Sequence, residues 1–185
     1  LCPRWLDFPA LFVGSMTPDL PYFVFAFPLA WAAHDPLGMV PVCLPVGLLA
    51  WLGLHAAWER ICDLLPDAHA GALRPRLGLS RIAWRDLARA SLSVPIGAAT
   101  HLAWDSMTHD DTWITGFAPA YVEPVVSVLG VPVPGFYVAQ QVSSIVGLAL
   151  VVVGYRRWRR GAAPPPAVIG TSDEATRRWR RRVWA

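Results

Sequence analysis

Two of the five histidines and three of the thirteen acidic residues lie together in THLAWDSMTHDD, residues 100–111. His101 and Asp105 are four residues apart, so on a helix they share one face. His109 follows four residues later and is displaced from His101 by only about 80° at 100° per residue. Imidazole nitrogens and carboxylate oxygens presented in this way suit zinc or a similar divalent ion. We therefore predict that His101, Asp105 and His109 bind a metal ion.

The two acidic residues that follow His109 are candidates for catalysis beside such an ion. A bound divalent ion lowers the pKa of a water ligand and polarises a phosphoryl or acyl oxygen. Asp110 or Asp111 would then act as a general base, or hold His109 in the required tautomer. A simpler interpretation stays open, in which the block is a helix end with a capping Asp and a histidine hydrogen-bonded to Asp.

Two further candidate ligands lie earlier in the chain, at Asp19 and His34. Asp19 stands between two prolines, which favour a rigid turn, although it also suits a simple helix cap. His34 directly precedes a long apolar stretch and equally suits a cap at a membrane interface. Fourteen residues separate the two, and a straight helix of that length spans about 21 Å. They share an ion only if the segment bends, which Pro21 and Pro28 favour.

The elements that must position these residues are predicted to be membrane helices. The chain of 185 residues is 55% hydrophobic and 16% charged, with a mean hydropathy of +0.39, whereas soluble domains carry about 25% charged residues. A membrane span needs about 20 apolar residues, and residues 37–58, 87–104 and 137–155 meet this need. Residues 20–33 and 119–133 are shorter and suit re-entrant or interfacial segments. We expect an all-α, polytopic membrane helix bundle with kinked or re-entrant segments.

The distribution of arginine orients these spans. Residues 59–90 contain six arginines and residues 156–160 contain four, whereas residues 105–136 contain none. Because cytoplasmic loops carry the excess of basic residues, the first two stretches should be cytoplasmic and the third should face outward. The metal ligands would then lie at the outer membrane face.

Three other features carry expectations about structure and partners. His55 and Glu59 are four residues apart and suit a structural pair, while His69 lies in the Arg-rich loop and should be solvated. Residues 1–160 should form the membrane domain. Residues 161–185 read as a Pro-rich linker and a basic tail, TRRWRRRVWA, which is either a disordered flank or a contact with anionic lipid.

Membrane lipids are therefore the expected partners, with no nucleic acid, and the oligomeric state stays open. Because the chain begins at Leu1 without a charged segment and a cleavage site, we expect its true N-terminus to be missing.

Several motifs together resemble a known family. GSMTPDLPYF at 14–23, the H-x-P-L-G of His34–Gly38, the block at 100–111 and QQVSSIVGL at 140–148 occur in this order. They resemble the small bacterial membrane family catalogued as domain of unknown function 4184, which is thought to be related to predicted membrane-bound metal-dependent hydrolases. The resemblance covers about residues 1–155 and implies a multi-pass protein of the bacterial cell membrane. Members of that family usually begin with a short T-x-S-H segment. This segment is absent here, and with its absence the chain lacks one possible metal ligand.

The order of the candidate ligands is also similar, more distantly, to the zinc-dependent phospholipase C and P1-type nuclease superfamily. The likeness implies one zinc bound by four residues: Asp19, His34, His101 and Asp105. It also implies a second zinc at His109. The remaining ligands of that second site are usually an H-x-x-x-E pair, and this chain has Gln140, Gln141 and Ser144 in the corresponding region. Amides and hydroxyls bind zinc poorly, so a mononuclear or degenerate site is expected.

These observations favour a membrane-embedded metal-dependent hydrolase acting at the outer face, on a lipid or lipid-linked phosphoester. Two alternatives stay open. The polar residues could pack helices in a non-catalytic membrane protein, or relay protons or ions in a transporter. A hydrolase needs its ligands within one coordination shell, and a relay needs them spread across the bilayer.

Overall fold

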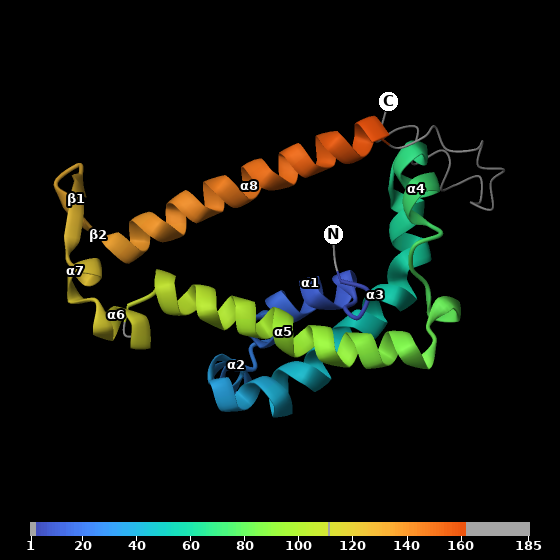
Figure 1. The fold of residues 1–185 in the computed structure, drawn as a ribbon, viewed down its shortest axis with the longest axis horizontal. Coiled ribbons are helices and arrows are strands. Elements are labelled where there is room, and N and C mark those ends of the chain that lie inside the picture. Colours follow the sequence, from blue (N-terminus) through green and yellow to red (C-terminus); the bar gives the residue numbers. More distant parts are fainter. Residues whose placement is uncertain (1–2, 111, 162–185) are drawn as a thin grey trace.

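The computed structural model describes residues 3–110 and 112–161 of the chain, and these are mostly helical (Figure 1). The basic tail beyond residue 161, where contact with anionic lipid is predicted, lies outside the described residues. Eight helices and one hairpin follow in order: α1 (Phe8–Met16), α2 (Phe27–His34), α3 (Leu44–Leu64), α4 (Asp67–Leu73), α5 (Trp84–Thr108), α6 (Trp113–Phe117), α7 (Pro119–Val122), β1 (Pro124–Val128), β2 (Val131–Pro134) and α8 (Gly135–Gly161).

Two helices in the described part of the chain are long and apolar enough to cross a membrane. They are Pro36–Leu64, with 29 residues, and Gly135–Gly161, with 27 residues. Both contain a predicted span, 37–58 in the first and 137–155 in the second. The third predicted span, 87–104, lies in α5, which does not pass the same test of length and composition. Length and composition alone do not establish a membrane bundle, which stays a prediction.

The first of these long helices begins irregularly. A 3-10 turn over Pro36–Gly38 leads into a π-helical turn over Met39–Cys43, and the regular α3 follows. Pro41 lies in the π-helical turn and Pro45 in the first turn of α3. Proline has no backbone N–H and its ring crowds the preceding turn, so it disturbs the helical hydrogen-bond ladder. The irregular start agrees with the kinks expected from these prolines.

The core forms where α1 crosses α5 at very short range. A Cβ atom added at Gly14 would lie 2.4 Å from the Val94 carbonyl oxygen, and one added at Gly97 would lie 2.3 Å from the Leu11 carbonyl oxygen. The two backbones therefore touch, and only glycine fits at these positions. Trp51 of α3 is fully buried and packs into the same core as Val94.

A polar contact fixes the start of α1 against both neighbouring helices. The Asp7 carboxylate accepts hydrogen bonds from the backbone N–H of Ala10 at 2.8 Å and from the Trp51 indole at 3.0 Å. The Asp7 N–H donates to the Ser93 hydroxyl at 2.9 Å. A capping carboxylate of this kind contributes about 0.5–2 kcal/mol to stability. Asp7 thus links α1 to α3 and α5.

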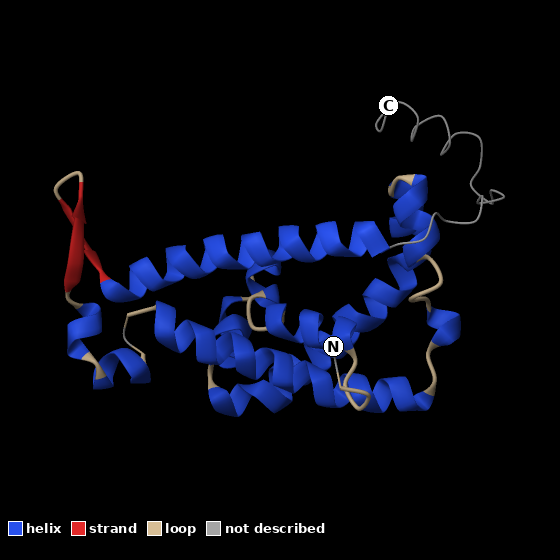
Figure 2. Ribbon diagram, turned by 45° about the horizontal axis from the view of Figure 1, so that its top comes forward, coloured by secondary structure: helices blue, strands red, loops and turns tan. Residues whose placement is uncertain are grey.

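The β1–β2 hairpin lies at one end of the molecule, away from this core, as Figure 2 shows, while α8 contacts α5. The hairpin turns through Leu129 and Gly130, both with positive φ, and the Leu129 side chain is fully exposed at its tip. Strand residues on both faces of the hairpin are apolar and exposed, among them Val125, Val126 and Val128. From the sequence, a re-entrant or interfacial segment was expected at 119–133, whereas the structure has two strands within this range and directly after it.

The C-terminal half of α8 contacts α4 through His69. The His69 Nε2 atom lies 2.8 Å from the Tyr155 hydroxyl, and the two rings stack with centroids 5.8 Å apart. The expectation that His69 is solvated therefore holds only in part, because its half-buried ring stacks on an aromatic residue of α8. The Arg-rich loop is folded onto α8 at this point.

The residues at the end of α3 pair differently from the expectation. Glu59 and Asp63 both bond the Arg74 guanidinium rather than a histidine. The hydrogen bond that Arg74 donates to Asp63 raises the pKa of Arg74, and Glu59 adds to this effect while partial burial opposes it. His55 is buried against the Trp51 ring and accepts a hydrogen bond from the Gly78 N–H at 3.2 Å. The expected pair of His55 with Glu59 is thus replaced by two separate contacts.

The backbone contact between α1 and α5 predicts a large effect of Gly97→Ala. The added methyl group would meet backbone atoms of α1 at 2.3 and 2.7 Å, and overpacking of this kind costs about 1–3 kcal/mol. Gly147→Ala in α8 is the matched control, since nothing lies within 4 Å of its added Cβ and alanine is the better helix former. Thermal unfolding in detergent should show a lowered midpoint for Gly97→Ala and an unchanged or raised one for Gly147→Ala. Equal midpoints would contradict the contact.

Candidate metal centre

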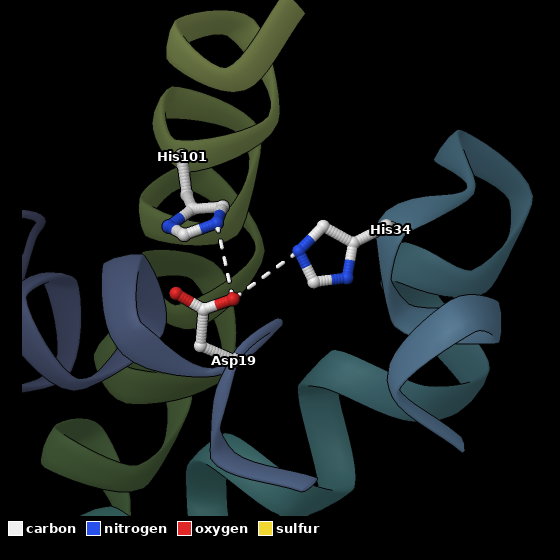
Figure 3. A group of neighbouring side chains, drawn as sticks. All are labelled: Asp19, His34 and His101. Atoms are coloured by element: carbon white, nitrogen blue, oxygen red, sulfur yellow. Dashed lines mark ion pairs between the residues drawn. The ribbon is translucent and has the colours of Figure 1, made fainter. Parts of the chain in front are cut away.

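Three separate elements bring three potential ligands to one point. Asp19 lies between α1 and the following 3-10 turn, His34 is the last residue of α2, and His101 lies in the second half of α5. One ligand atom from each lies within 4.8 Å of the others (Figure 3). These three side chains could hold a metal ion.

The chain reverses between Asp19 and His34, as a shared ion requires. The 3-10 turn over Leu20–Val24 ends at Phe25, whose backbone is left-handed with a φ of 57°. The left-handed residue redirects the chain into α2, so that its C-terminal end returns to Asp19. The required bend between the two predicted ligands is therefore present, at Phe25.

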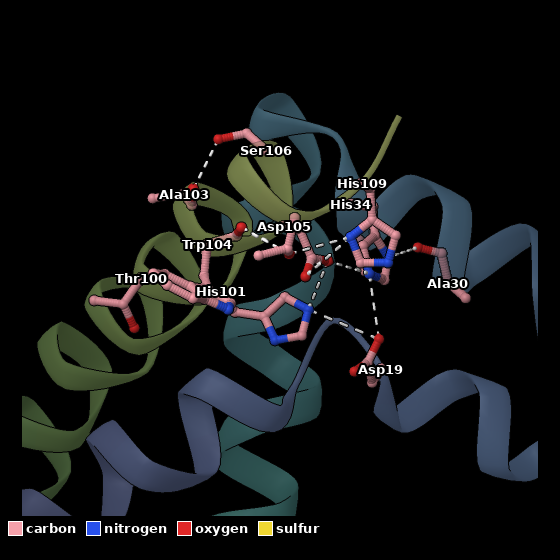
Figure 4. A network of polar contacts seen from close by, with 12 residues as sticks. Asp19, Ala30, His34, Thr100, His101, Ala103, Trp104, Asp105, Ser106 and His109 are labelled. Carbon is pink, nitrogen blue, oxygen red and sulfur yellow. Dashed lines mark hydrogen bonds and ion pairs between the residues drawn. The ribbon is translucent and has the colours of Figure 1, made fainter. Parts of the chain in front are cut away.

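Asp105 completes the cluster from α5. Its Oδ2 lies 3.0 Å from His101 Nε2 and 3.6 Å from His34 Nε2. Asp19 Oδ1 lies 3.3 Å from His34 Nε2 and 3.8 Å from His101 Nε2 (Figure 4). Each carboxylate thus faces both imidazoles. Ligand atoms that each lie about 2.0–2.2 Å from one zinc ion are separated by about 3–4 Å, and these four histidine–carboxylate distances lie in that range.

The orientation of His34 leaves a lone pair pointing at this cluster. Its Nδ1 lies 2.8 Å from the carbonyl oxygen of Ala30, one turn earlier in α2. A carbonyl accepts hydrogen bonds only, so Nδ1 carries a proton and Nε2 is the free nitrogen of the neutral ring. A neutral Nε2 facing two carboxylates at 3.3 and 3.6 Å is unfavourable unless a positive charge lies between them. Either a metal ion or a second proton on His34 meets that need.

His101 shows the same need more clearly. Its Nε2 is buried and has no well-aligned hydrogen bond, although Asp105 Oδ2 is only 3.0 Å away. A metal ion between His101 and the carboxylates would satisfy this nitrogen. The donor set of two imidazoles and two carboxylates suits zinc.

Asp19 is not a helix cap, although its position permits one. It precedes the 3-10 turn over Leu20–Val24, yet its side chain makes no capping hydrogen bond there. By contrast, Asp35 accepts a hydrogen bond from the Leu37 N–H at 2.7 Å, as a cap does. The Asp19 carboxylate is directed to the histidines instead. The capping interpretation applies to Asp35 and fails for Asp19.

His109, Asp110 and Asp111 lie at the edge of the cluster. His109 Nδ1 is 3.8 Å from Asp105 Oδ1, the oxygen opposite to the one that faces His34 and His101. His109 and Asp110 are both exposed just beyond α5, and Asp111 lies outside the described residues. His109 is therefore an outer neighbour of Asp105 and is not among the three converging residues. The predicted role of Asp110 and Asp111 in catalysis stays a prediction.

The region predicted to correspond to a second zinc site forms the first turns of α8. The Gln140 carbonyl oxygen accepts hydrogen bonds from the hydroxyls of Ser143 at 2.8 Å and Ser144 at 2.9 Å. The Ser144 hydroxyl is thus used within its own helix. The expectation of a mononuclear or degenerate site stays a prediction.

Two neighbours of the cluster were missed by the sequence analysis. The Ala30 carbonyl orients His34, and the Tyr22 ring lies 5.8 Å from the His34 ring. The spacing of four residues between Ala30 and His34 was the available signal, because a helical histidine reaches the carbonyl one turn earlier. No residue pattern in the sequence predicts the contact of Tyr22 with His34, because this contact depends on the bend at Phe25.

The geometry predicts that His101→Ala removes bound zinc, because His101 contributes the most buried nitrogen of the cluster. His109→Ala is the matched control and should retain zinc, since His109 faces only the outer oxygen of Asp105. Mass spectrometric metal analysis of purified protein measures both, with circular dichroism to confirm folding. Equal zinc contents in the two variants would show that the convergence does not bind metal.

Comparison with known proteins places the chain in a family without adding an activity. The sequence model of a family described as a domain of unknown function (DUF4184) matches residues 1–185. No curated protein and no solved structure is similar enough to count as a match. The family description gives no function and no link to a superfamily. The family match covers the whole chain, and the protein therefore belongs to the DUF4184 family.

Proposed function

We propose that the protein is a membrane-embedded hydrolase that depends on a divalent metal ion, zinc by its ligand types, held at the outer membrane face. Asp19, His34, His101 and Asp105 would bind the ion. One observation carries the proposal: residues from three separate segments bring each of two imidazole nitrogens within 3.0–3.8 Å of both carboxylates. The Nε2 atom of His101, which is buried and makes no well-aligned hydrogen bond, supports the proposal.

A zinc ion, when bound, lowers the pKa of a water ligand to near neutrality and polarises a substrate oxygen. The chain's own residues determine how it is presented. Ala30 holds the His34 ring so that Nε2 faces the centre. The side chain of Asp19 is 49% exposed and that of His101 only 16%. A substrate would therefore approach from the side of Asp19, with His101 at the floor of the site.

The residues after α5 would transfer the proton of the attacking water. Hydrolysis adds the oxygen of water to phosphorus or to an acyl carbon, breaks the bond to the leaving oxygen, and transfers a proton to that oxygen. Asp110 or Asp111 would act as the base and then return the proton. His109, held 3.8 Å from Asp105, would connect these residues to the centre.

The non-catalytic alternative has one observation in its favour. Protonated His101 would form an ion pair with Asp105 at 3.0 Å, one turn apart on α5, and would need no metal. In that case the cluster joins α1, α2 and α5 as a packing contact. The relay alternative requires ionisable residues spread along a path, and the close convergence of these side chains speaks for a single centre instead.

Substitutions of Asp105 and Asp110 separate binding from catalysis. Asp105→Asn keeps the shape of the side chain but removes its negative charge, so it should lose most bound zinc. Asp110→Asn should retain zinc and reduce hydrolysis by about 10–100-fold, the usual effect of residues outside the ligand set. Zinc content and the hydrolysis of a chromogenic phosphodiester and of phospholipid in mixed micelles are the measurements. Loss of folding in Asp105→Asn without loss of zinc would support the packing role instead.

A further inference from the structure

An exposed aromatic surface lies between the two ligands Asp19 and His34. Residues 20–33 carry no formal charge. Phe23, Phe25 and Trp31 are 75%, 80% and 68% exposed. Two other aromatic residues of the segment, Tyr22 and Phe27, are also exposed. We call these five residues together the aromatic face. So many large aromatic side chains on one short segment are unusual for a surface in water, since contiguous apolar patches mark binding or membrane contact.

Phe25 holds an unfavourable backbone conformation at the centre of this face. Its φ of 57° is left-handed, which costs a residue with a Cβ about 1–2 kcal/mol. Its side chain is 80% exposed, and its ring lies near that of another residue of the face, Phe27, with centroids 6.3 Å apart. Contacts with the core of the protein therefore do not account for a bulky residue at this position. Transfer of the exposed ring into an apolar phase would offset the cost.

The face is continuous with the metal centre and with a helix of membrane length. The Tyr22 ring lies 5.8 Å from the His34 ring. Asp35 separates His34 from the apolar helix Pro36–Leu64 and caps its first turn. The centre and the face therefore both lie at one end of that helix. Aromatic residues concentrate at this level of a membrane, where hydrocarbon meets the headgroups.

We infer that the aromatic face contacts the acyl chains of the bilayer and admits the substrate sideways from the membrane. The substrate class is then an amphiphilic ester, whose chains lie against Phe23 and Phe25 while its head reaches the cluster of Asp19, His34 and His101. This inference rests on the proposed function for the reaction, but the lipid contact itself can be measured without turnover. The half-exposed Asp19 lies on the route from the face to the centre.

Fluorescence quenching in proteoliposomes tests the contact. Cys43 and Cys62 are buried, so Cys2→Ala gives a background in which Phe25→Cys is labelled selectively with bimane. We expect strong quenching by phosphatidylcholine brominated near the headgroup end of its acyl chains, and weak quenching by aqueous iodide. Leu150→Cys on exposed α8 and Ser80→Cys in the loop are the lipid and water controls. Quenching of residue 25 by iodide alone, or of Leu150→Cys by iodide alone, would overturn the inference.

Phe25→Gly provides a second, independent test. Glycine accepts positive φ without strain, so the variant should keep or raise the thermal midpoint in detergent. It should nevertheless show reduced labelling of residues 20–33, located by mass spectrometry of peptides, by a phospholipid with a diazirine on its acyl chain. Unchanged photolabelling would contradict the inference, and so would disulfide-linked dimers through Phe25→Cys, which would indicate a second copy on the face. Zinc content separates the two proposals: zinc without lipid labelling refutes only the face, and labelling without zinc refutes only the hydrolase.

Discussion

The backbone contact between α1 and α5 is the constraint on which the candidate centre depends. Gly14 and Gly97 let the two helices touch at distances that a methyl group would prevent. Because α1 ends close to this crossing, Asp19 emerges beside His101 and Asp105. A wider crossing would move the carboxylate out of reach of both imidazoles. The identity of two small residues thus determines whether ligands from distant parts of the chain can share one charge.

The two carboxylates of the cluster favour a cation between them and the histidines. Asp19 and Asp105 each approach both histidines, and the Ala30 carbonyl directs the neutral nitrogen of His34 toward them. Two carboxylates would repel each other in a partly buried setting unless protons or a metal ion neutralise them. Protonated histidines would be sufficient for a packing contact, whereas a metal ion would also allow the centre to catalyse hydrolysis. The buried Nε2 atom of His101 lies 3.0 Å from Asp105 Oδ2 and suits either state.

Local patterns in the sequence predicted much of this, and the rest required the tertiary fold. The spacing of His101 and Asp105 indicated a shared helical face, and α5 presents both to the cluster. Charge-free stretches located the two long apolar helices. The bend at Phe25 could not be predicted, because a phenylalanine in a left-handed conformation contradicts its intrinsic preference. The exposed β1–β2 hairpin was missed for a similar reason, since Leu129 occupies a turn position that favours glycine or asparagine.

X-ray absorption at the zinc edge of the purified, zinc-loaded protein tests the central claim most directly. The account predicts a shell of nitrogen and oxygen atoms only, at about 2.0–2.2 Å, with the outer scattering of two imidazole rings. His34→Ala should reduce that outer scattering by half. A sulfur atom at about 2.3 Å would instead mean that cysteine binds the ion. A zinc ion without imidazole scattering would show that the cluster of Asp19, His34, His101 and Asp105 is not a metal centre.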